Sequence, residues 1–154
     1  MRNTLALAAL ALAASVSAGE LAPSELSLGG VVSGATEASV VRLLGEPATR
    51  TDTGEGTEFH YPGLVVTVGW LEQKGPAVQR RVKALMATGP RACTPRGLCP
   101  GMPSSEVSRL FGPSAPVQRE SGTFFEFQPE GVACWLQVSA SAAIVESVAV
   151  ACQP

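Results

Sequence analysis

Few residues in this chain could carry out catalysis. It contains one histidine, His60, and one aspartate, Asp52, so a Ser-His-Asp triad would need both of them. No serine lies between the two, and the sequence has no nucleophile elbow of the Gly-x-Ser-x-Gly kind. We therefore expect no catalytic residues, and we interpret His60 as a strand residue on an exposed sheet face.

The four cysteines, Cys93, Cys99, Cys134 and Cys152, favour a structural role. Cys93 and Cys99 are too far apart for the Cys-x-x-Cys motif of redox proteins. Once disulfides are allowed for, no histidine or cysteine pair has the spacing of metal ligands, so we expect no metal and no cofactor. An even number of cysteines in an exported chain is typical of disulfides, and four cysteines allow three pairings.

Residues 1–18 have the pattern of a cleaved export signal. Arg2 supplies the positive start, residues 5–14 form an apolar run, and small residues at 16–18 form a cleavage site before Gly19. The apolar run is too short to span a membrane. The net charge is −2 and no long basic run occurs, so we expect no nucleic-acid binding and no integral membrane segment in the mature chain. The sequence predicts a periplasmic or secreted protein.

The elements that must position the remaining side chains come in two copies. Residues 30–48 and 97–115 align at an offset of 67 with seven identical pairs, among them Gly34/Gly101, Arg42/Arg109 and Gly45/Gly112. Apolar residues at i, i+3 and i+4 predict short helices over 36–45 and 103–111. Thr36 is the expected N-cap of the first, and Gly45 and Gly112 are the expected terminators. We predict two units, 19–90 and 91–154, in one compact domain.

Turn signals after each helix separate three strand candidates. We expect strands over 57–61, 64–71 and 79–87, and again over 123–128, 132–138 and 144–152. Polar loops are expected at 46–57 and 114–122, and a turn at 73–76. Short connections favour antiparallel order. The predicted fold is α+β, with two tandem helix-plus-antiparallel-β-meander repeats whose helices pack on one face of the sheet.

The repeat favours one disulfide pairing. At the offset of 67, Cys93 and Cys99 align with Leu26 and Val32, two apolar residues that flank a glycine turn. A disulfide there would replace an apolar contact at the same place, which favours Cys93 with Cys99.

By elimination, Cys134 would then pair with Cys152, but the expected register makes this difficult. If the turn spans 139–143 and Val138 faces Ile144, Cys152 lies four residues beyond the partner of Cys134. A bulge, a longer loop or a different pairing would each resolve this difficulty.

Alternation along the strands predicts a second sheet face, directed away from the helices. If Phe59 and Phe125 point into the core, their neighbours point outward, and Arg81 and Lys83 alternate against Val82 and Ala84. Aromatic and basic side chains on one face are typical of protein-recognition surfaces. The alternative, that a neighbouring strand or the other unit covers Trp135, stays open. The candidate binding residues are His60, Arg81, Lys83, Phe124, Trp135 and Gln137.

The repeated motif resembles that of a known family. The segments 34–46 and 101–113 share the pattern Gly-x-Thr/Pro-x-x-x-Val-x-x-Leu-x-Gly, which resembles the BamE/SmpA outer-membrane assembly lipoproteins. Used in tandem, the motif is similar to the β-lactamase inhibitory protein (BLIP-like) family. That resemblance implies two helix-plus-meander units that form one concave sheet.

The sequence favours a binding protein over an enzyme. We expect an exported, non-catalytic module that binds another protein through the exposed sheet face, as an enzyme inhibitor or an envelope assembly factor. The alternatives are a small secreted hydrolase, which would need a nucleophile or an acid and base in a pocket, and a structural envelope protein.

Overall fold

The computed structural model describes residues 19–70 and 79–153. The predicted export signal, Leu71 and the turn expected at 73–76 lie outside the described residues. The ordered elements are a 3-10 turn η1 (Pro23–Glu25), the helices α1 (Glu37–Leu44) and α2 (Ser105–Phe111), and the strands β1 (Ser27–Leu28), β2 (Val31–Val32), β3 (Thr49–Thr53), β4 (Gly56–Tyr61), β5 (Leu64–Trp70), β6 (Arg80–Ala87), β7 (Val117–Arg119), β8 (Gly122–Phe127), β9 (Cys134–Ala140) and β10 (Val145–Cys152).

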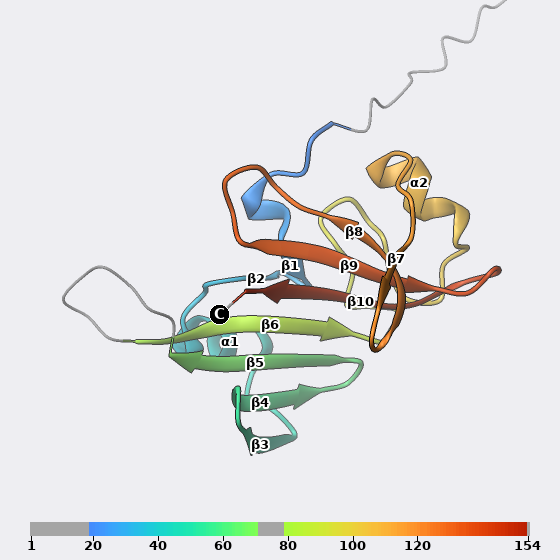
Figure 1. The fold of residues 1–154 in the computed structure, drawn as a ribbon. Helices are drawn as coiled ribbons and strands as arrows, with labels where there is room; N and C mark the ends of the chain where they lie inside the picture. Colours follow the sequence, from blue (N-terminus) through green and yellow to red (C-terminus); the bar gives the residue numbers. More distant parts are fainter. Residues whose placement is uncertain (1–18, 71–78, 154) are drawn as a thin grey trace, which may run out of the picture.

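One antiparallel sheet of eight strands dominates the fold, in the order β3-β4-β5-β6-β10-β9-β8-β7 (Figure 1). Strands β1 and β2 form a separate two-stranded hairpin. The α+β class predicted from the sequence is confirmed. Each helix is followed by four strands, and the last strands of the two sets, β6 and β10, pair with each other in the middle of the sheet.

The helices form at the two predicted places. The Thr36 Oγ1 accepts a hydrogen bond from the Ser39 amide at 3.2 Å, which satisfies one free donor at the start of α1. Gly45 and Gly112 follow the two helices with φ of 80° and 86°, a backbone region that side chains disfavour. The second helix begins at Ser105, and no side chain caps it.

Both helices contribute to one buried core. Val40 of α1 and Val107 and Phe111 of α2 are buried in the same cluster as Phe59 of β4 and Leu136 of β9. The apolar stripe of α1 differs from the prediction, because Val41 and Leu44 pack on the core while Leu43 is 56% exposed. The buried stripe consists of Val40, Val41 and Leu44, and not of Val40, Leu43 and Leu44 as the i, i+3, i+4 spacing predicts.

Two strands of the eight-stranded sheet were not predicted. The segments 49–53 and 117–119, expected as parts of polar loops, are the edge strands β3 and β7. Every residue of β3 is exposed, and the sequence Thr-Arg-Thr-Asp-Thr has no apolar alternation that could reveal a strand. Such polar or very short edge strands disfavour pairing with another chain. Each predicted three-stranded meander is therefore four-stranded.

The disulfides follow the favoured pairing, Cys93 with Cys99 and Cys134 with Cys152. The register expected for the last hairpin was wrong, because Val138 faces Val148 and not Ile144. The turn occupies residues 141–144, which accounts for three residues of the shift, and a bulge between Val145 and Ser147 adds the fourth, so that Cys134 lies directly opposite Cys152.

Two segments before the helices extend the sheet in the same way. The Gly34 amide donates to the Val82 carbonyl at 2.9 Å, and the Val82 amide donates to the Ala35 carbonyl at 2.8 Å. The Gly101 amide donates to the Val145 carbonyl at 2.8 Å, and Val145 donates in turn to Met102 at 2.8 Å. Each helix therefore starts from a segment bonded to the last strand of its own set.

Within residues 19–70 and 79–153, no helix has the length and apolar character needed to cross a membrane.

Candidate functional site

The sheet face opposite the buried core carries one continuous row of side chains. Cross-strand pairing joins neighbouring residues from β4 to β8 in the order His60, Val65, Met86, Ala149, Gln137 and Glu126. We call this side of the sheet the open face. In Figure 1 helix α1 lies behind β5 and β6, and no helix lies in front of them. Met86, near the centre of the row, is 42% exposed.

The open face brings together four of the six candidate binding residues. His60 and Gln137 stand in the central row, four strands apart in sheet order. Trp135 precedes Gln137 by two residues on β9, and Phe124 precedes Glu126 by two residues on β8, so both share the same face. All four side chains are half-buried.

Charged groups lie at the two ends of the central row. At one end, His60 Nε2 lies 3.3 Å from Glu58 Oε2. At the other, Arg119 donates to both oxygens of Glu126 at 2.9 and 2.6 Å, and Gln137 donates to Glu126 at 2.9 Å. The hydrogen bonds from Arg119 hold the pKa of Glu126 below its ordinary value, burial opposes this effect, and Gln137 reinforces it. The middle of the face is therefore apolar and its ends are polar.

Trp135 carries one of the two enclosed side-chain nitrogens that lack a hydrogen-bond partner among the described residues, and Arg81 Nε is the other. The unpaired nitrogen of Trp135 is the indole Nε1. A buried Trp N–H normally finds an acceptor. Opposite Trp135 on β10 lies the small residue Ala151, so the broad indole has space to lie along the sheet.

The side chains of Arg81 and Lys83, the other two candidates, donate hydrogen bonds to backbone carbonyls of other segments. The Arg81 guanidinium donates to the Gly34 carbonyl at 2.9 Å, and Lys83 donates to the Glu55 carbonyl at 3.1 Å. A bulge makes Thr67 face Ala84 but Val68 face Val82, which leaves Lys83 as the extra residue of β6.

The same bulge explains why sequence reasoning missed Met86. The prediction that Ala84 points inward with Val82 was wrong, because the extra residue changes the alternation: Val82 and Leu85 are buried. Ala84 and Met86 consequently share the open face. Strict alternation along the sequence gives no sign of such a bulge.

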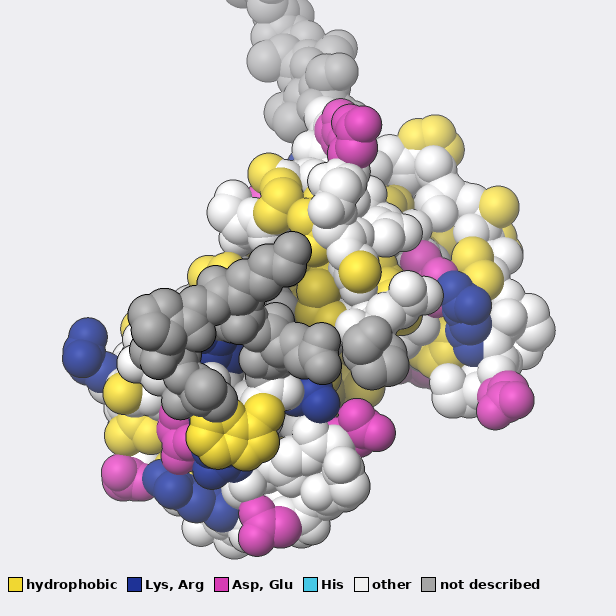
Figure 2. Space-filling model, turned by 60° about the vertical axis from the view of Figure 1, so that its left-hand side comes forward, with side chains coloured by type: hydrophobic (Ala, Val, Ile, Leu, Met, Phe, Trp, Pro, Cys, Tyr) yellow, Lys and Arg dark blue, Asp and Glu magenta, His cyan; other side chains and the backbone are white. Residues whose placement is uncertain are grey.

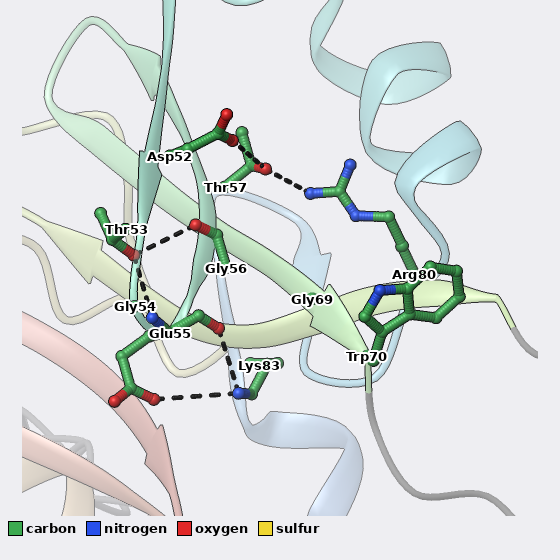
Figure 3. A pocket seen from close by; sticks show the side chains of 10 residues that line it. All are labelled: Asp52, Thr53, Gly54, Glu55, Gly56, Thr57, Gly69, Trp70, Arg80 and Lys83. Atoms are coloured by element: carbon green, nitrogen blue, oxygen red, sulfur yellow. Dashed lines mark hydrogen bonds and ion pairs between the residues drawn. The ribbon is translucent and has the colours of Figure 1, made fainter.

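A separate hollow of about 530 Å³ lies at one end of β4, β5 and β6 (Figure 3). The β3–β4 turn forms one side and the Trp70 ring the other. Sequence reasoning did not identify this site, because its members come from three separate segments. The lining residues are Asp52, Thr53, Gly54, Glu55, Gly56, Thr57, Gly69, Trp70, Arg80 and Lys83.

Neither a triad nor a metal cluster forms in the part of the chain that the structure describes. His60 lies opposite Thr49, whereas Asp52 lies opposite Thr57 and accepts a 2.7 Å hydrogen bond from its hydroxyl. His60 lies three positions along β4 from Thr57, the partner of Asp52, and three positions of a strand span about 10 Å. No group of three His, Cys, Asp or Glu residues is placed to hold a metal within these ranges.

No family model and no curated protein matches the sequence. Among solved structures, the chain is similar to an extracellular protein containing an SCP domain from Bacillus anthracis str. Ames, with a TM-score of 0.50 and 13% identity over 78% of this chain. The match spans 44% of that protein. A DUF4309 family protein (YjgB) from Bacillus subtilis subsp. subtilis str. 168 has a TM-score of 0.49 and 13% identity, with 77% of this chain and 78% of that chain covered. At this identity the first likeness concerns the fold alone.

Proposed function

We propose that this chain is an exported, non-catalytic module that binds another protein through the open face, as an enzyme inhibitor or an envelope assembly factor. The observation that carries the proposal is the row that runs without interruption from His60 to Glu126 across six strands. Its centre is apolar and its ends are polar, as in protein interfaces with an apolar core and a polar rim.

The composition of the open face supports binding of a folded partner. Met86 offers an exposed, flexible and polarizable side chain, which adapts to the shape of a partner. Trp135 and Phe124 add aromatic area on the same face, and aromatic residues supply much of the binding energy at interfaces. Ala149 and Ala84, which have small side chains, lie in the middle of the face between these larger residues.

The proposal includes a tandem origin for the two halves, residues 19–90 and 91–154. It is supported by the similarity of residues 30–48 to residues 97–115. The backbone hydrogen bonds of Gly34 with Val82 and of Gly101 with Val145 are also equivalent in the two halves. Under this proposal the chain resembles the BamE/SmpA and BLIP-like families in arrangement, and the open face spans the junction between two related units.

An extracellular or periplasmic location is also part of the proposal. Two disulfides favour a chain that folds in an oxidising compartment. The similar structure from Bacillus anthracis is described as extracellular, and residues 1–18 have the sequence pattern of an export signal.

The test is a pull-down from the envelope and culture fractions of the producing cells, with three forms of the chain. Met86→Glu introduces a charge at the centre of the open face, and Leu43→Glu introduces the same charge at an exposed site on α1. We expect a protein that is retained by the wild type and by Leu43→Glu and is lost with Met86→Glu. Equal retention by both variants would refute the proposed face.

A further inference from the structure

Beyond protein binding, we propose that the hollow beside Trp70 binds a neutral saccharide. The site is distinct from the open face row and involves none of the six residues in it. Its volume of about 530 Å³ lies within the range of small-molecule sites. The proposal is independent of the protein-binding function.

The aromatic wall of the hollow is unusually accessible. Trp70 is 62% exposed although it belongs to a strand of the large sheet. Its cross-strand partner is Arg80, which lies beside the indole (Figure 3). A large flat ring exposed to this extent offers apolar area to a ligand with a matching flat face, and the C–H face of a sugar ring is such a surface.

The opposite wall is rich in groups that donate and accept hydrogen bonds. Thr53 donates from its hydroxyl to the Gly56 carbonyl at 3.1 Å, and Thr57 donates to Asp52 at 2.7 Å. The carboxylates of Asp52 and Glu55 retain free lone pairs, since a carboxylate has about four acceptor sites. Sugar hydroxyls suit such a wall because each is both donor and acceptor.

The charges in the hollow are balanced, which selects against a strongly charged ligand. Arg80 pairs with Glu37 at 3.2 Å and donates to Thr57, and Lys83 lies 3.8 Å from the Glu55 carboxylate. Charges of both signs gather on the lower lobe of the molecule, where β3 and β4 lie (Figure 2). A neutral ligand can meet these groups without displacing either ion pair.

The backbone is shaped to keep the hollow open. A Cβ at Gly69 would lie 2.8 Å from Lys83 Cδ and 3.1 Å from the Glu55 carbonyl oxygen, so a side chain there would push both into the space. The bulge in β6 adds Lys83 at the same place, and bulges often direct a side chain towards a site. Gly69 and the bulge together set the depth of the hollow and the position of the Lys83 ammonium group.

The test is calorimetric titration of the full mature chain with maltotriose, cellotriose and chitotriose, and with triglycine as a probe of another class. We compare the wild type with Trp70→Ala and with Leu43→Ala, an exposed apolar site on α1 outside the hollow. We expect at least one trisaccharide to bind with a Kd of about 1 mM or lower, and Trp70→Ala to weaken it by about tenfold or more while Leu43→Ala does not.

Three outcomes would overturn the proposal: no trisaccharide binding at concentrations up to about 10 mM, equal binding by wild type and Trp70→Ala, or binding of triglycine alone. Circular dichroism of Trp70→Ala checks that the variant is folded, which its exposed position leads us to expect. If Trp70→Ala were unfolded, Trp70→Leu and Asp52→Asn would be titrated, and unchanged affinity in both would overturn the proposal. None of these results depends on the open face.

Discussion

Replacing Arg96 should destabilise the protein more than any comparable change at the surface. Its guanidinium donates to both oxygens of Glu25, from Nε to Oε1 at 2.6 Å and from Nη2 to Oε2 at 3.0 Å. It also donates to the carbonyls of Glu20 at 3.0 Å and Leu110 at 3.2 Å, and lies 5.2 Å from the ring centroid of Phe111. One side chain therefore joins the start of the described chain to the loop before α2.

The expected magnitude follows from the burial of this ion pair. The Arg96 and Glu25 side chains are only 18% and 22% exposed. Removing one partner of a fully buried pair costs about 3–5 kcal/mol, and partial access of water to Glu25 reduces this figure. We expect Arg96→Ala to lower the free energy of unfolding by about 2–3 kcal/mol. The thermal midpoint should fall by roughly 6–12 °C.

The matched control is Arg109→Ala, which removes an ion pair with Glu106 one turn away on α2. Arg109 is far more exposed than Arg96, and surface pairs contribute little, so its midpoint should stay close to that of the wild type. Both variants are measured by calorimetry and urea unfolding at pH 7. Equal shifts for Arg96→Ala and Arg109→Ala would show that burial does not decide the strength of these pairs.

The same pair predicts a pH dependence. The hydrogen bonds from Arg96 hold the pKa of Glu25 below its ordinary value; burial opposes this, and the Ala22 amide reinforces it at 2.8 Å. Because the folded-state pKa is lowered, the stabilisation is complete above the unfolded pKa of about 4.3 and is lost as the pH falls through the folded value. The difference in unfolding free energy between wild type and Glu25→Gln should therefore shrink below about pH 4.3. A difference that stays constant from pH 7 to pH 2 would contradict this account.

Three further predictions concern other parts of the fold. Replacing both Cys134 and Cys152 with alanine should lower the unfolding free energy by about 3 kcal/mol in urea, because the disulfide closes a loop with a sequence separation of 18; a loss below about 1 kcal/mol would show that the link hardly constrains the unfolded chain. Thr36→Ala should cost about 1 kcal/mol by removing the cap of α1, and unchanged stability would mean that the 3.2 Å cap bond has no net value. Trp135→Phe removes an unmet donor and keeps a ring, so its urea midpoint should be equal to or higher than that of the wild type, and a marked decrease would reveal an acceptor for the indole N–H.

Sequence signals were sufficient for the helices, the α+β class and the Cys93–Cys99 disulfide, whereas Cys134–Cys152 followed only by elimination. Helix α1 has a capping hydroxyl at Thr36 and a glycine with positive φ at Gly45, and both act within a few residues of the helix. The pairing of Cys93 with Cys99 could be predicted because, at the offset of 67, they align with Leu26 and Val32, two apolar residues that flank a turn.

Features that depend on the partner strand could not be read from one segment. Strand β3 has no apolar residue, so only its pairing with β4 identifies it. The bulge at Lys83 shifts the alternation, which hid Met86. The position of the β9–β10 turn and the bulge before Ser147 together explain why Cys152 was misplaced in the expected hairpin. The hollow likewise requires four strands, β3 to β6, to meet, and no single stretch of sequence contains it.

The most direct test of the central proposal is site-specific photo-crosslinking in living cells. A photoreactive amino acid replaces Met86 on the open face or Leu43 on α1, the two exposed apolar positions on different elements. We predict one discrete crosslinked protein from position 86 and none from position 43, with the position-86 product lost when Trp135→Ala is added to a folded chain. Absence of a product at position 86, or the same product from both positions, would contradict recognition through the open face.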